Sequence, residues 1–135
     1  MTPVTDGAAL LGRLLLSVIF VLGGAGKLAD FSATVALMGN EGLPLPIAAA
    51  IVAIAVEGVG GALMVVGWHA RETAAVLAAW CIATALVAHR DFAVEDQMIN
   101  FLKNVAMAGG FLQVVAFGAG GWSLDARRAA ILRGA

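Results

Sequence analysis

Long apolar stretches alternate with short polar segments along the chain. We predict one helix over each stretch, at about residues 7–26, 46–67, 71–89 and 98–117. The segment VLAAWCIATALVA of the third stretch is apolar all the way round, whereas a helix of a soluble bundle confines its apolar residues to one stripe. Because a spanning helix needs about 20 predominantly apolar residues, the pattern predicts an all-α, four-helix transmembrane bundle.

The link between the first two stretches carries helix signals of its own. Residues 30–34 are typical of a helix start, and Gly39 is typical of a helix end. Phe31, Val35 and Met38 fall on one side of the helix between them. We therefore expect a short interfacial helix in the first external loop.

Composition supports a membrane protein and excludes several other classes. Apolar residues make up 61% of the 135 residues and charged residues 13%, against about 45–50% and about 25% in soluble domains. This length fits a single integral membrane domain. The net charge of −1, without a basic stripe, gives no basis for nucleic-acid binding. Cys81 is the only cysteine, and residues 118–121 precede no strand–helix unit, so we expect neither a metal nor a nucleotide.

The basic residues predict how the bundle is oriented in the membrane. One side collects five of them and the other side three: Arg13, Arg71, Arg127, Arg128 and Arg133 against Lys27, Arg90 and Lys103. Since Lys and Arg are more frequent on the cytoplasmic side, we predict a multi-pass protein of the cell (plasma or inner) membrane with both termini cytoplasmic. No basic residue precedes the first apolar stretch, so we expect that stretch to be a retained anchor.

Two ionisable residues fall deep inside the predicted spans. Arg13 lies about two turns from the cytoplasmic end of the first span, and Glu57 about three turns from the outer end of the second. A charge at this depth costs about 2.5–3.5 kcal/mol on insertion scales, so it needs a partner or a proton. We predict an Arg13–Glu57 ion pair, which is either a structural bridge or a proton relay.

Further polar residues gather at the outer end of the predicted bundle. His89 ends the third span, and Asn100, Lys103 and Asn104 lie in the outer half of the fourth. Since Lys103 and Asn104 diverge by about 100° around the helix, they cannot both face one neighbouring helix, and this favours a cavity between the third and fourth spans. The alternative is that Lys103 reaches outward to the headgroups and Asn104 bonds to a neighbouring helix. The candidate ligand-binding residues are Glu57, His89, Asn100, Lys103 and Asn104.

Together these motifs make the chain resemble the DoxX family of small four-helix membrane proteins. The matching segments, in chain order, are Arg13 with IFVLGGAGKL, then GLPLP, Glu57 with GVGG, HRDF, NFLKNVAMAGG and GAGGWSLD. The family takes its name from a relative of the membrane subunit of a thiosulfate:quinone oxidoreductase, and other members are linked to oxidative-stress complexes. The resemblance therefore implies a quinone-linked redox role, with quinone as the cofactor and redox-complex subunits as partners.

Three functional hypotheses follow from the residues and the resemblance. In the first, the protein is a redox subunit or accessory, in which Lys103, His89 and Asn104 donate hydrogen bonds to a quinone while Glu57 and Arg13 hold or relay a proton. In the second, it is a non-enzymatic scaffold or assembly factor. In the third, it carries a small solute or lipid as a homo-oligomer. No nucleophile lies with a base and an orienting partner, so the sequence gives no support for hydrolytic chemistry. Whether the protein is an enzyme stays open.

Overall fold

The computed structural model describes residues 2–134, and every regular element in this range is a helix. In chain order the elements are α1 (Pro3–Ala29), α2 (Phe31–Asn40), α3 (Pro46–Ile54), the π-helical turn η1 (Ala55–Val59), α4 (Gly60–Val66), α5 (Ala70–Ala88), α6 (Glu95–Phe117) and α7 (Leu124–Gly134). By length and composition, four helices can cross a membrane: Pro3–Ala29, Pro46–Val66, Ala70–Ala88 and Glu95–Phe117. The predicted all-α fold with four spans is confirmed.

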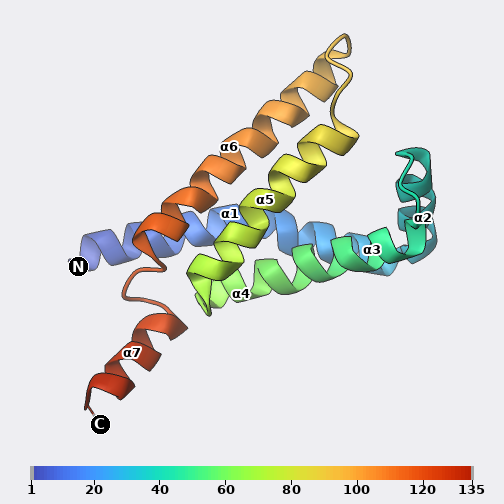
Figure 1. Ribbon diagram of the computed structural model, residues 1–135. Coiled ribbons are helices and arrows are strands. Elements are labelled where there is room, and N and C mark those ends of the chain that lie inside the picture. Colours follow the sequence, from blue (N-terminus) through green and yellow to red (C-terminus); the bar gives the residue numbers. More distant parts are fainter. Residues whose placement is uncertain (1, 135) are drawn as a thin grey trace.

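The spans form two helical hairpins that cross each other (Figure 1). In the first hairpin α1 packs along the continuous helix α3–η1–α4, and in the second α5 packs along α6. The hairpins meet mainly through α4 and α5, with a smaller contact between α1 and α6. The N-terminus and α7 lie at one end of the first hairpin, and α2 lies at the other (Figure 1).

The core lies where the two hairpins cross. Its large buried side chains are Phe20, Met64, Leu77, Cys81 and Phe111. The rings of Phe20 and Phe111 meet edge to face, with their centroids 5.4 Å apart, and so join α1 to α6. Because lipid is as apolar as these side chains, close packing rather than the hydrophobic effect holds such helices together.

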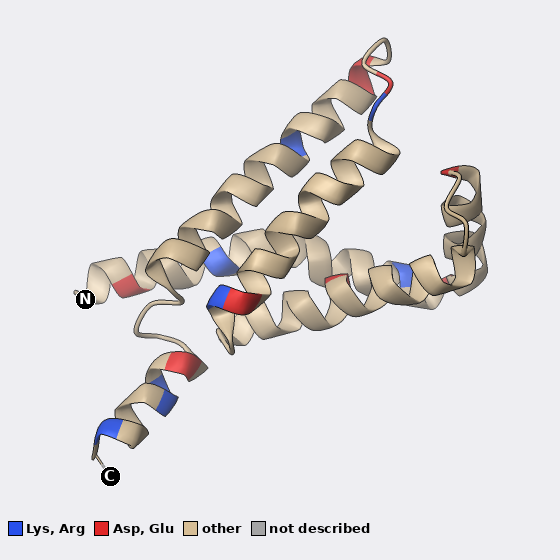
Figure 2. Cartoon of the chain, viewed as in Figure 1, with Lys and Arg blue, Asp and Glu red and all other residues tan. Residues whose placement is uncertain are grey.

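Most charged residues lie at the ends of the spans or outside them, and Arg13, Glu57 and Lys103 are exceptions within the spans (Figure 2). They gather at the start of α5, in the loop between α5 and α6, and on α7. On the outer faces of the spans the exposed side chains are large and apolar, for example Leu15 and Leu22 on α1 and Val76 on α5. This surface suits contact with lipid.

The helix ends explain where the observed bounds differ from the predicted ones. α1 begins four residues earlier than predicted, at Pro3, because Thr2 caps it by accepting a hydrogen bond from the Thr5 N–H at 3.4 Å. α6 begins at Glu95 instead of Met98, and the acidic residues Glu95 and Asp96 suit the positive end of its dipole.

The short helix predicted in the first external loop is confirmed as α2. Its cap is Asp30, whose Oδ1 accepts a hydrogen bond from the Ala33 N–H at 3.0 Å. This bond, together with one from the Ser32 hydroxyl, lowers the pKa of Asp30 below its ordinary value.

The sequence analysis missed α7. Its signal is Ser123, whose Oγ accepts a hydrogen bond from the Ala126 N–H at 3.1 Å, as in an N-terminal cap. The hydropathy of the segment gave no such signal, because its three arginines and Asp125 interrupt the apolar residues.

Candidate functional site

Glu57 lies on the one π-helical turn of residues 2–134. This turn, η1, interrupts the span Pro46–Val66 near its middle. A π-helical turn inside an α-helix is rare and is often found at functional sites. It widens the helix locally and projects Glu57 toward α1, although the side chain stays buried.

Two side chains from different hairpins bind the Glu57 carboxylate. The Lys27 Nζ of α1 donates to its Oε2 at 2.6 Å, and the Trp80 Nε1 of α5 donates to its Oε1 at 3.2 Å. The Glu57 side chain is 12% exposed and the Lys27 side chain 26%. The carboxylate therefore has one donor on each oxygen, which is how a charge within a bilayer is stabilised.

Glycines of α1 let Glu57 and its helix come close. A Cβ atom on Gly23 would lie 2.8 Å from the Glu57 Oε2, and one on Gly24 would lie 2.5 Å from the Gly58 backbone nitrogen. Lys27 is one turn beyond Gly23, and helical side chains tilt toward the helix N-terminus. Its ammonium group therefore reaches back over the space that Gly23 leaves open.

An apolar pocket of about 540 Å³ lies between α1 and the α3–η1 helix, and none of the triad of Lys27, Glu57 and Trp80 lines it. Gly24 and Gly58, the neighbours of Gly23 and Glu57, line it where α1 and η1 touch. Its other lining residues are apolar and come from α1, α2, α3 and η1: Val21, Ala25, Leu28, Phe31, Ile51, Ile54, Ala55 and Val59. The candidate site is therefore the buried carboxylate with its two N–H donors, and the pocket is linked to it only through Gly24 and Gly58, which directly follow Gly23 and Glu57 in the sequence.

The structure corrects the predicted ion pair between Arg13 and Glu57. The guanidinium of Arg13 donates instead to three backbone carbonyls, those of Met64 at 3.0 Å, Val65 at 3.2 Å and Trp122 at 2.7 Å. It is fully buried, and its Nε is without a hydrogen-bond partner within residues 2–134.

The physical reason for this correction is distance along α1. Glu57 sits at the level of Gly23, ten residues or about 15 Å beyond Arg13 on a helix. The carbonyls at the end of α4 carry partial negative charge and lie within reach of Arg13. A cation at this position therefore caps a helix end.

The outer polar residues are held by local partners. His89 places its Nδ1 2.7 Å from the Oε1 of Gln97, across the loop between α5 and α6. The Nδ2 of Asn104 donates at 3.0 Å to the carbonyl of Asn100, which is one turn earlier in the same helix. The Asn104 bond therefore stays within α6, whereas the His89 bond joins the end of α5 to the first turn of α6.

Lys103 does not complete the predicted cluster. Its side chain is exposed, and within residues 2–134 neither a hydrogen bond nor an ion pair joins it to His89 or Glu57. The expected contact of its amine with one of these groups is therefore corrected. Whether Glu57, His89, Asn100, Lys103 and Asn104 bind a ligand stays a prediction.

Sequence reasoning missed Trp80 entirely and placed Lys27 only at the outer surface. The available signal for Lys27 was its spacing of four residues from Gly23, which puts a cation over a gap in the helix surface. For Trp80, a tryptophan in the middle of a span was itself a signal, because its N–H needs an acceptor when buried. Among the residues that the structure describes, no group of three or more His, Cys, Asp or Glu could hold a metal ion.

Comparison with known proteins places these residues in a family context. The DoxX family model matches residues 8–90, the segment that contains Lys27, Glu57 and Trp80. The inner membrane protein YphA of Escherichia coli is 37% identical over 123 residues, which cover 87% of this chain and 88% of YphA. The inner membrane protein YqjF of the same organism is 31% identical over 128 residues, covering 93% of this chain and 95% of YqjF. No solved structure matches the chain.

Proposed function

The chain belongs to the DoxX family of integral inner membrane proteins, and we propose that it serves a quinone-linked redox process as a membrane subunit or accessory. In this proposal the quinone head group binds at Lys27, Glu57 and Trp80. Both termini face the cytoplasm, as the distribution of basic residues predicts.

The observation that carries the proposal is the pair of N–H donors on a buried carboxylate. A quinone has two carbonyl oxygens, and both the Lys27 ammonium and the Trp80 indole can donate to such an acceptor. The donors now lie 2.6 Å and 3.2 Å from the two Glu57 oxygens. A quinone carbonyl that enters between Glu57 and one donor accepts the hydrogen bond of that donor in place of the carboxylate, so the donor does not lose its partner.

The apolar pocket lined by Gly24 and Gly58 suits the rest of such a molecule. Ligand sites in helical bundles are largely apolar and have a few convergent polar groups. In this proposal the pocket of about 540 Å³ supplies the apolar part, and its lining residues Gly24 and Gly58 directly follow Gly23 and Glu57 in the sequence. A quinone substituent can lie there while the head group faces Glu57.

Glu57 is the group that can hold a proton in this site. A quinone, when bound, takes up two electrons and two protons on reduction to the quinol. In this proposal the electrons come from a redox partner protein. Glu57 can accept a hydrogen bond from a quinol hydroxyl, and Lys27 stabilises the carboxylate when it is ionised. Trp80 orients the head group, because its single N–H has one direction.

Binding of a short-chain quinone tests the proposal. We expect saturable quenching of tryptophan fluorescence when decylubiquinone is added to the purified protein in a neutral detergent. The dissociation constant should rise about tenfold or more in Lys27→Gln, because a hydrogen bond to a charged group is worth about 1.5–3 kcal/mol. Lys103→Gln is the matched control, since it removes the same charge from an exposed position and should leave binding unchanged.

Two results would overturn the proposal. One is the absence of saturable quenching in a wild-type protein that unfolds cooperatively. The other is an equal loss of affinity in Lys27→Gln and Lys103→Gln, which would mean that only overall charge matters.

The scaffold hypothesis also has a specific observation in its favour. Arg13 joins α1 to the end of α4 and to the loop before α7 through three carbonyls. Lys27, Glu57 and Trp80 likewise join three helices. If the protein is a scaffold, it should co-purify with a protein partner and no quinone, and Arg13→Gln should disrupt that association more than Lys27→Gln does.

A further inference from the structure

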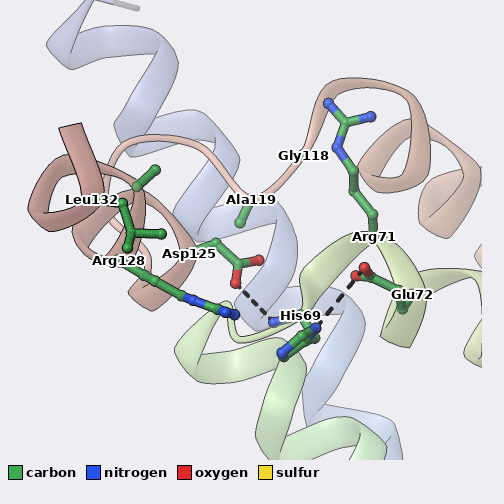
Figure 3. A pocket seen from close by; sticks show the side chains of 9 residues that line it. His69, Arg71, Glu72, Gly118, Ala119, Asp125, Arg128 and Leu132 are labelled. Atoms are coloured by element: carbon green, nitrogen blue, oxygen red, sulfur yellow. Dashed lines mark hydrogen bonds and ion pairs between the residues drawn. The ribbon is translucent and has the colours of Figure 1, made fainter.

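A second pocket, of about 360 Å³, lies at the end of the bundle that carries both termini. It is formed by the start of α5, the end of α6 and the first turns of α7 (Figure 3). The residues that matter for its chemistry are His69, Arg71, Glu72, Asp125 and Arg128. This pocket is separate from the triad around Glu57, which shares none of its lining residues.

Asp125 builds the pocket by tying α7 to the start of α5. Its carboxylate accepts the backbone N–H groups of His69 at 2.9 Å and Ala70 at 2.8 Å, and its own N–H donates to the Gly67 carbonyl at 3.0 Å. His69 has a positive φ of 46°, which is uncommon for a residue other than glycine. The Asp125 charge is therefore engaged by the helix N-terminus.

Two arginines flank the pocket from opposite sides (Figure 3). Arg71 uses its Nη1 to donate to the Val115 carbonyl at 2.8 Å, and Arg128 lies over the Trp68 ring, 5.5 Å from its centroid. Within residues 2–134 no carboxylate forms an ion pair with either arginine. Since a guanidinium has five N–H donors, both side chains keep donors for an anion.

The position of the pocket corresponds to the level of lipid headgroups. Trp68 and Trp122 lie at this end of the spans, as expected for the aromatic belt of a membrane protein. The pocket lies next to the last turn of one span and the first turn of another. Basic residues at the edge of a span attract anionic lipids, and Arg71 in the first turn of α5 and Arg128 on α7 stand at such positions.

We infer that this pocket binds the phosphate of a membrane phospholipid, with Arg71 and Arg128 as its ligands. Planar guanidinium groups suit phosphate oxygens, which they can bind in pairs. Glu72 lies at the pocket, 3.9 Å from the His69 Nδ1, with its side chain 73% exposed. Because Glu72 is negatively charged, it favours a lipid phosphodiester, which carries one negative charge, over free phosphate, which carries more negative charge.

Lipid titration with native mass spectrometry tests this inference. The purified protein in a neutral detergent is titrated with dihexanoyl phosphatidylglycerol, and inorganic phosphate forms a separate arm. We expect one tightly bound lipid per chain, with an affinity about tenfold lower in Arg128→Gln, because a charge-assisted hydrogen bond is lost. Arg127→Gln, the adjacent charge change outside the pocket, should keep wild-type affinity.

Three outcomes would overturn the inference. Equal weakening in Arg127→Gln and Arg128→Gln would show that the helix attracts lipid only by overall charge. Wild-type protein without a bound lipid would remove the site. Displacement of the lipid by an equal concentration of inorganic phosphate would assign the pocket to a soluble anion. If Arg128→Gln fails to fold, Arg71→Lys replaces it, because it keeps the charge while losing the paired geometry.

Discussion

Lys27 and Glu57 form a 2.6 Å ion pair between α1 and η1, inside the membrane-spanning part of the chain. The pair is the meeting point of three features: the glycines that bring α1 and η1 together, the π-helical turn, and Trp80 from the other hairpin. The ion pair joins the two helices of the first hairpin, and the Trp80 hydrogen bond to Glu57 links them to the second hairpin. These three residues are also the polar groups of the proposed quinone site.

The ion pair predicts strong coupling between two substitutions. Lys27→Met and Glu57→Gln should each lower the free energy of unfolding, on the order of 3 kcal/mol for removal of one partner of a buried pair. The double variant should lose less than the sum by about 1–3 kcal/mol. Reversible unfolding in mixed micelles measures all three. Arg13→Gln combined with Glu57→Gln should be additive, because these residues have separate partners; coupling of this second pair would restore the sequence-based prediction.

Close contact between α1 and η1 predicts a large effect of one methyl group. Gly24→Ala should destabilise the protein by about 1–3 kcal/mol, because its Cβ would lie 2.5 Å from the Gly58 backbone nitrogen. Gly26→Ala is the control on the same helix, since a Cβ there meets nothing within 4 Å. The control should gain about 0.5–1 kcal/mol from helix propensity. Thermal unfolding of both variants checks the contrast, and equal effects would contradict the contact.

These contrasts show what the sequence could and could not predict. Periodicity and composition were sufficient for the four spans, because a bilayer sets their length and polarity. The partner of Glu57 was not predictable in the same way, since it depends on how far α1 slides along the neighbouring span. Gly24 meets Gly58 at that register, and the sequence does not say which small residues of the two helices meet. Trp80 was missed for a related reason, because the crossing of the hairpins decides which α5 residue meets η1.

The orientation of the protein gives a prediction that the basic residues alone determine. Five basic residues flank the end with the termini and three the other, so the termini should be cytoplasmic. A reporter fused after Ala135 should be active in the cytoplasm. A reporter inserted after Phe92, in the loop between α5 and α6, should be active on the other side. Activity of both reporters in the same compartment would contradict the four-span topology.

The cap of α2 predicts a pH dependence confined to that helix. The pKa of Asp30 is lowered in the folded protein, mainly by the Ala33 N–H and then by the Ser32 hydroxyl. The stabilisation is therefore present above the ordinary carboxyl pKa of about 3.9 and is lost as the pH falls through the lowered value. Hydrogen exchange of residues 31–40 should accelerate only in that acidic range. Asp30→Asn, which keeps an acceptor without the charge, should abolish this pH dependence; an unchanged profile would exclude the cap as its cause.

Photoaffinity labelling with an azidoquinone, followed by peptide mapping, tests the central claim most directly, because it locates the quinone on the chain. We predict label on residues 21–28 and 54–59 or on Trp80, competed by unlabelled quinone and reduced in Lys27→Gln. Labelling of residues 100–104 near Lys103 instead, or labelling that unlabelled quinone does not compete, would contradict the assignment of the site to Lys27, Glu57 and Trp80.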